Sequence, residues 1–114
     1  MNTKIFCDIA DISTIKKFNK KIIVKGFTTN PSLIRKAGAK DYKSYSKRIL
    51  KVCKNKPVSF EVFADENKPM IEQGLIISSW GKNVYVKVPV VNSKNRFTGS
   101  VIRELNNKKI KLNI

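Results

Sequence analysis

The sequence contains no histidine, and its two cysteines, Cys7 and Cys53, lie far apart in the chain. Their separation matches none of the short spacings that bind zinc or form redox pairs, so we expect neither a metal site nor a cofactor. The glycine-rich phosphate signatures G-x-G-x-x-G and G-x-x-x-x-G-K-[ST] are also missing. Their absence argues against a nucleotide-binding α/β fold.

Long apolar segments are missing as well. A membrane-spanning helix needs about 20 consecutive apolar residues, and no run of that length occurs. The N-terminus lacks the charged, apolar and small-residue regions of a signal peptide. We therefore expect a protein of the reducing cytoplasm that has no membrane partner.

Acidic residues are scarce, with 8 Asp and Glu against 24 Lys and Arg, for a formal net charge of +16. A basic surface raises the question of a nucleic-acid or anionic-membrane partner. The lysines are spread along the whole chain, without a basic tail, an arginine cluster or interleaved aromatic residues. We predict a lysine-rich solvated surface without specific nucleic-acid binding. A basic nucleic-acid-binding protein on an α/β scaffold remains an alternative.

The length of 114 residues allows one domain, residues 1–114. A complete (β/α)8 barrel needs roughly 250 residues. Short runs rich in β-branched and aromatic residues recur at regular intervals. They are Ile5–Ile9, Ile22–Thr28, Val58–Ala64, Val84–Val90 and Ile110–Ile114. Because these runs are almost continuously apolar, they predict parallel strands that are covered on both faces.

Helical patterns separate these runs. Asp11 can cap a first helix, and Asn30 followed by Pro31 is a strong helix start. The pattern after Pro31 is interrupted at Gly38 and resumes at Tyr42. Two further helices are predicted at Lys68–Trp80 and Ser100–Asn107. The alternation predicts an α/β fold with parallel strands. Periodicity alone does not separate a doubly wound sheet from part of a barrel, but the missing glycine signatures favour the barrel.

Polar residues interrupt the apolar runs near their carboxyl ends. Functional side chains gather at that end of the strands in parallel α/β folds. The candidates are Asp8, Thr28, Asn30, Glu61 and Lys87. Glu61 and Lys87 stand within apolar strands, where a charge is costly to bury unless it is paired.

Each candidate also has a structural interpretation. Asn30 can simply cap a helix, Asp8 can cap a helix or lie in a loop, and Glu61 and Lys87 can form a buried ion pair. In the functional interpretation, an amine in an apolar site loses its proton readily and becomes a nucleophile, and a nearby carboxylate moves protons. A lysine with two carboxylates and no histidine fits Schiff-base chemistry better than hydrolysis.

Two segments resemble the transaldolase and fructose-6-phosphate aldolase family. Gly26–Ile34 closely resembles its Thr-Thr-Asn-Pro-Ser signature, and Val84–Pro89 resembles its active-site lysine segment. The Asp8 segment and Pro57–Val62 follow the same order and spacing. The resemblance covers essentially all 114 residues and implies the (βα)4β portion of a TIM-type (β/α)8 barrel.

The resemblance also implies roles for the candidates. Lys87 would form a Schiff base with a ketose phosphate, and Asp8 would be the acid/base that breaks the carbon–carbon bond. Glu61, with Asn30 and Thr28, would position water, and Asn30 would also contact the donor. Because the family's transaldolases carry Glu where its aldolases carry Gln, Glu61 favours transfer of a dihydroxyacetone unit between sugar phosphates in the non-oxidative pentose phosphate pathway. A fructose-6-phosphate aldolase is the alternative.

The chain ends at Ile114, inside the expected fifth strand. The resemblance implies that a catalytic threonine and the phosphate-binding serine and arginine would follow in a second half. We therefore expect a truncated barrel with little turnover on its own, whose open strand edges favour a homo-oligomer or a complementary half-barrel. A non-catalytic half-barrel remnant or interaction module is a further alternative.

Overall fold

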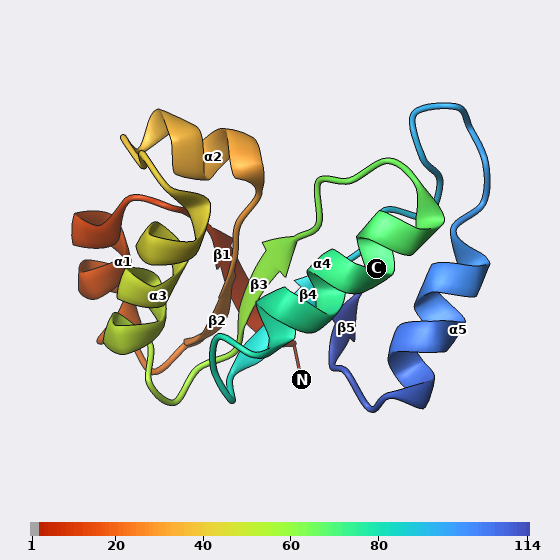
Figure 1. Ribbon diagram of the computed structural model, residues 1–114. Helices are drawn as coiled ribbons and strands as arrows, with labels where there is room; N and C mark the ends of the chain where they lie inside the picture. Colours follow the sequence, from red (N-terminus) through yellow and green to blue (C-terminus); the bar gives the residue numbers. More distant parts are fainter. Residues whose placement is uncertain (1–2) are drawn as a thin grey trace.

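The computed structural model describes residues 3–114 and contains one parallel sheet whose strands follow the order of the chain, β1-β2-β3-β4-β5 (Figure 1). The strands are β1 (Ile5–Asp8), β2 (Val24–Thr28), β3 (Val58–Glu61), β4 (Val84–Lys87) and β5 (Leu112–Asn113). The helices are α1 (Ile12–Asn19), α2 (Pro31–Lys36), α3 (Tyr42–Val52), α4 (Asn67–Ser78) and α5 (Gly99–Asn107). Sequential parallel strands with helical connections are the arrangement of part of a (β/α)8 barrel, which confirms the predicted α/β fold class.

The strands are shorter than the apolar runs predicted. β3 ends at Glu61 and β4 at Lys87, although the predicted runs extend three positions further in each case, to Ala64 and Val90. Val62 N–H still donates to the Lys87 carbonyl at 3.1 Å, and Val88 N–H to the Asn113 carbonyl at 3.0 Å. Beyond these bonds the chain leaves the sheet, and Val90 is 51% exposed. The ends of the apolar runs therefore belong to the loops at the carboxyl edge.

One face of the sheet packs against the helices, and the other, called the open face below, is only partly covered. Burial alternates along β4 as a result. Val84 and Val86 are buried, whereas Tyr85 and Lys87, which point to the other face, are half-buried. In β3, Ser59 and Phe60 are both buried although they point to opposite faces. The prediction that both strand faces are covered therefore holds within β3 and is wrong for β4. The covered face and the helices together form the hydrophobic core. Its largest fully buried side chains include Phe27, Phe60, Ile15, Ile34, Ile49, Met70 and Leu105.

The helices divide into two groups along the sheet. Figure 1 shows α1, α2 and α3 beside β1 and β2, and α4 and α5 near β4 and β5. Packing follows the same division, since α3 contacts α1 and α2, and α4 contacts α5 and β4. Within residues 3–114, none of the helices has the length and apolar character that crossing a bilayer requires.

Side chains cap three helices at their N-termini. Asp11 accepts a hydrogen bond from Thr14 N–H, Asn30 from Leu33 N–H and Asp41 from Ser44 N–H. The predicted starts at Asp11 and Asn30 are thereby confirmed. The predicted interruption at Gly38 is also confirmed, because Gly38 has φ 95 and separates α2 from α3. This left-handed conformation is easy for glycine, which has no Cβ.

The Asp41 cap predicts how stability depends on pH. Hydrogen bonds from the Ser44 hydroxyl and then from Ser44 N–H lower the pKa of Asp41 below its ordinary value. A lowered pKa in the folded state adds stability above the unfolded-state pKa, and this stability is lost as pH falls through the folded pKa. Asparagine also caps helices but does not titrate, so Asp41→Asn should show a smaller loss of stability between pH 6 and pH 3. These limits lie about two units above and about one unit below the ordinary pKa of an aspartate.

Urea unfolding of Asp41→Asn and the parent chain at both pH values measures this difference. Glu72→Gln removes an exposed carboxylate from α4 and serves as the control. If Asp41→Asn and the parent chain lose the same amount of unfolding free energy between pH 6 and pH 3, the prediction is wrong.

Candidate active site

Asp8 and Thr28 meet at the carboxyl ends of β1 and β2. They are partners in the strand register, and Thr28 Oγ1 donates a hydrogen bond to Asp8 Oδ1 at 3.0 Å. Asp8 is exposed and Thr28 is half-buried. The backbone continues the pairing, since Ile9 N–H donates to the Thr28 carbonyl at 3.1 Å. The hydroxyl therefore fixes the orientation of a carboxylate that stays open to a ligand.

Glu61 and Lys87 are the last residues of β3 and β4 and are also partners in the strand register. Both are half-buried, and both lie on the open face because their neighbours Phe60 and Val86 are fully buried. The ion pairs found among residues 3–114 join Lys94 to Glu66 and Lys108 to Glu104. The alternative of a buried Glu61–Lys87 ion pair is therefore wrong for the described residues.

Asn30 caps α2, as its structural interpretation predicted. Its Oδ1 accepts a hydrogen bond from Leu33 N–H at 2.9 Å, and its backbone is extended, with φ −150. The cap uses the carbonyl oxygen of the side chain alone. The Nδ2 group of an asparagine carries two further donors, so capping is compatible with donation to a ligand.

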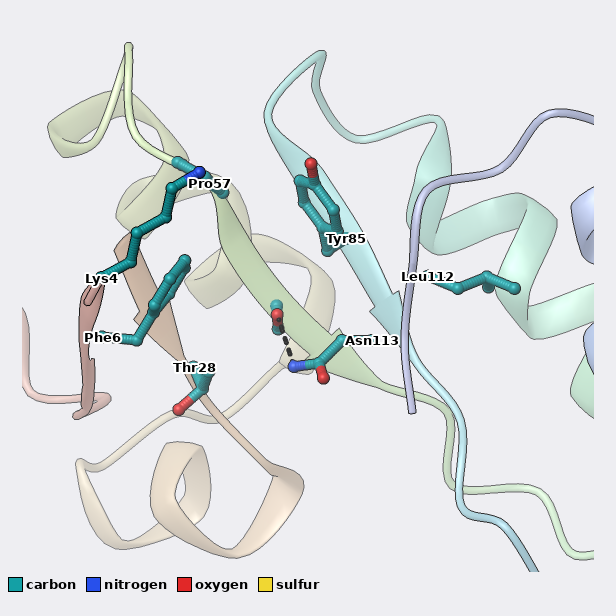
Figure 2. Close-up of a pocket in the computed structure, with 8 residues that line it drawn as sticks. Lys4, Phe6, Thr28, Pro57, Tyr85, Leu112 and Asn113 are labelled. Carbon is teal, nitrogen blue, oxygen red and sulfur yellow. Dashed lines mark hydrogen bonds between the residues drawn. The ribbon is translucent and has the colours of Figure 1, made fainter. Parts of the chain in front are cut away.

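A groove of roughly 400 Å³ lies on the open face of the sheet (Figure 2). Figure 2 shows Phe6 and Asn113 on the two sides of the groove with Thr28 between them, whereas Leu112 points away from the groove toward the helices. Asn113 Nδ2 donates a hydrogen bond to Ser59 Oγ at 3.0 Å, which links β5 to β3 across the groove. The full lining is Lys4, Phe6, Thr28, Pro57, Ser59, Tyr85, Leu112 and Asn113.

The groove continues into the strand-end residues. Ser59 and Tyr85 precede Glu61 and Lys87 by two positions in the same strands, so they share the same face. Lys87 is also paired in register with Asn113 of β5. The structure thus brings Asp8, Thr28, Glu61 and Lys87 to one edge of one face, with the groove adjoining them.

Sequence reasoning missed Ser59, Tyr85 and Asn113 as groove residues. The two-residue period of a strand was a usable signal for Ser59 and Tyr85, because each stands two positions before a candidate. Asn113 carried no comparable signal. Its contact with Ser59 joins residues 54 positions apart and depends on the register of three strands.

Loops at the same edge are held together by hydrogen bonds. Asp65, in the β3–α4 loop, accepts bonds from the N–H and the hydroxyl of Ser93, in the β4–α5 loop, at 2.8 and 2.5 Å. The bond from the Ser93 hydroxyl, followed by that from its N–H, lowers the pKa of Asp65. This contact ties the loop that follows Glu61 to the loop that follows Lys87.

Polar residues at the carboxyl ends of sequential parallel strands, with helices covering the other face, define a protein of the (β/α)-barrel class. A family model described as Transaldolase/Fructose-6-phosphate aldolase matches residues 5–114. The chain belongs to this family, and the resemblance of its motifs is confirmed.

Relatives named probable transaldolase match most of the chain. The protein of Dehalococcoides mccartyi is 42% identical over 86 residues, which are 75% of this chain and 40% of the relative. That of Sulfurihydrogenibium sp. is 36% identical over 111 residues, 97% of this chain and 49% of the relative. That of Thermoplasma volcanium is 38% identical over 112 residues, 96% and 48% of the two chains. The chain spans about half the length of the curated relatives it matches.

Proposed function

We propose that this chain carries the imine-forming part of a transaldolase-type active site, which transfers a dihydroxyacetone unit from a ketose phosphate to an aldose phosphate. The observation that carries the proposal is the pairing of Lys87 with Glu61 at the strand ends of the open face. Membership of the family and the names of the relatives support it.

Lys87 is the proposed nucleophile. Its amine nitrogen attacks the ketose carbonyl carbon, and the carbonyl oxygen takes up a proton to give a carbinolamine. Loss of that oxygen as water forms the protonated imine. The imine accepts the electrons of the bond between the next two carbons, the α and β carbons, when that bond breaks. Glu61, on the neighbouring strand, moves the protons and holds the water of this step.

Asp8 is the proposed acid/base of bond cleavage. Its carboxylate accepts the proton of the sugar hydroxyl, and the new carbonyl forms as the carbon–carbon bond breaks. The bonding electrons pass to the imine and give an enamine, while an aldose phosphate leaves. The Thr28 hydroxyl, 3.0 Å from Asp8, orients the carboxylate, and the Asn30 amide contacts the bound donor. The reverse steps join the unit to an acceptor, and water releases the product from Lys87.

Cleavage without transfer is the second candidate, because the family description covers fructose-6-phosphate aldolase as well as transaldolase. In that reaction the enamine carbon takes up a proton to give the imine again, and water hydrolyses this imine to release free dihydroxyacetone and the amine of Lys87. One measurement distinguishes the two candidate reactions. A transaldolase forms a new ketose phosphate when an acceptor aldose phosphate is added, whereas an aldolase releases dihydroxyacetone at the same rate with or without the acceptor.

We also propose that turnover needs more of the barrel than this chain contains. The open face presents one wall of a site, and among the described residues β1 and β5 each pair with a single strand. A complementary half-barrel or a second copy of the chain would close these edges. Imine formation at Lys87 uses groups already on this wall, so it is the step that the chain alone should perform.

Borohydride trapping tests the proposal. The chain is incubated with fructose 6-phosphate, reduced, digested and mapped by mass spectrometry, both alone and with the second half of the Dehalococcoides mccartyi relative. We expect one reduced adduct, located on Lys87, and faster trapping with the second half. The proposal fails if Lys87 stays unmodified under both conditions, or if the adducts are spread evenly over the exposed lysines.

A further inference from the structure

A tyrosine of α3 contacts the strand that carries Glu61. Tyr42 Oη donates a hydrogen bond to the backbone carbonyl of Glu61 at 3.0 Å. One helical turn later, Tyr45 Oη donates to the carbonyl of Ala10 at 2.8 Å. The two phenols make the same kind of bond from the same helix, but only Tyr42 reaches a residue of the proposed imine-forming step.

The Glu61 carbonyl lacks a donor from the neighbouring strand. β2 donates to every second carbonyl of the β3 segment, from Phe27 N–H to Pro57 at 2.9 Å and from Thr29 N–H to Ser59 at 3.1 Å. The next donor in this series would be residue 31, which is a proline and has no N–H. Asn30 is still extended, so the series would otherwise continue. The Tyr42 hydroxyl takes the place of the missing donor.

Packing holds Tyr42 in this position. Its ring contacts those of Phe60, Phe63 and Trp80, with centroids 5.7 to 6.5 Å apart. Burial, and then the nearby charge of Glu61, raises the pKa of the Tyr42 phenol well above its ordinary value. The hydroxyl therefore stays protonated and able to donate throughout the neutral pH range.

The chain just after Glu61 is fixed from a second helix. Phe63 N–H and Ala64 N–H both donate to Gln73 Oε1 of α4, each at 2.9 Å. Val62 N–H donates to the Lys87 carbonyl. The point at which β3 leaves the sheet is thus set by Tyr42 on the β2 side and by Lys87 and Gln73 on the other.

We propose that Tyr42 is a positioning residue, which sets the exit of β3 and thereby directs the Glu61 carboxylate toward the amine of Lys87. This inference rests on the proposed imine chemistry and adds a residue to it. Tyr42 does not touch the reacting atoms. It acts through Glu61, so its contribution should disappear when Glu61 can no longer move protons.

A double-mutant cycle tests this coupling. The rate of imine formation with dihydroxyacetone is measured by timed borohydride quenching of the full chain. Tyr42→Phe keeps the ring and removes the hydroxyl, and we expect it to slow imine formation about tenfold, since small displacements of catalytic groups have large rate effects. In the Glu61→Gln background the same change should have no further effect. Tyr45→Phe, the matched control, should react at the parental rate.

The outcomes are distinguishable. If the parent chain forms no imine on Lys87, the proposed function fails and the inference fails with it. If the parent chain reacts but Tyr42→Phe slows the Glu61→Gln chain as much as the parent, the role of Tyr42 is only structural and the inference alone is overturned. An unchanged rate in Tyr42→Phe also overturns it.

A second variant decides the question if Tyr42→Phe does not fold. Pro31→Ala restores an N–H at residue 31, in line with the Glu61 carbonyl, so the Pro31→Ala/Tyr42→Phe chain regains a donor. If that chain folds and reacts near the parental rate, the donor role is supported. If it folds and reacts as slowly as Glu61→Gln, the inference is overturned.

Discussion

Replacing Lys87 with methionine should reduce imine formation by about a thousandfold or more, because the substituted chain has lost the attacking amine itself. Methionine is unbranched and close in length to the lysine stem, so the half-buried position should tolerate it. The intact mass of the chain is measured after reduction in the presence of dihydroxyacetone, at a ketone concentration that gives one adduct per parent chain.

Lys111→Met is the matched control for this loss. Lys111 donates to the Lys82 carbonyl at 3.2 Å, and its Nζ lies 5.8 Å from the centroid of the Tyr85 ring. The change removes an amine near the same groove without touching Lys87, and the single adduct should persist. Equal adduct in Lys87→Met and the parent chain would show that another lysine reacts, and the assignment of Lys87 would be wrong.

Replacing Phe60 with alanine should cost about 3–5 kcal/mol of unfolding free energy. Phe60 is 0% exposed and packs edge-on against Tyr42 and Trp80 at the centre of the covered face. Folded domains are stable by only about 5–15 kcal/mol, so this loss should leave the chain close to its unfolding transition. Urea unfolding followed by circular dichroism and by Trp80 fluorescence measures the shift.

Phe97→Ala makes the same chemical change at a residue that is 70% exposed. Its effect should stay within about 0.5 kcal/mol, as is usual for surface positions. Similar losses in the two variants would contradict the placement of Phe60 in the core and of Phe97 on the surface.

Much of the fold could be predicted from local patterns. Apolar runs separated by helical periodicity are local features, and so are the caps at Asp11 and Asn30, which the structure contains as expected. Strand ends were harder to predict, because hydrophobicity does not reveal where a chain leaves the sheet. Phe63 continues an apolar run but is 62% exposed in the loop after β3.

The site could be predicted only in part. Polar residues that interrupt apolar runs can be recognised in the sequence alone, and these are Asp8, Thr28, Glu61 and Lys87. The bonds from Asn113 to Ser59 and from Tyr42 to Glu61 depend on strand register and helix packing. No local pattern contains that information. The sequence pattern predicts a helix start at Pro31, but the effect of this proline on the carbonyl of Glu61 depends on the hydrogen bonds between the β2 and β3 segments.

The order of the strands also bears on how the chain acquires its structure. Each strand from β2 onward pairs with the strand that was synthesised just before it. A nascent chain leaving the ribosome can therefore add one strand and one helix at a time to an existing sheet edge, without waiting for a distant partner. Successive partners are close in sequence, so the entropy cost of each addition is smaller than that of joining strands from distant parts of the chain. During such growth the strand added last has one unpaired edge until the next strand is synthesised. Premature association with other nascent chains would begin at this unpaired edge.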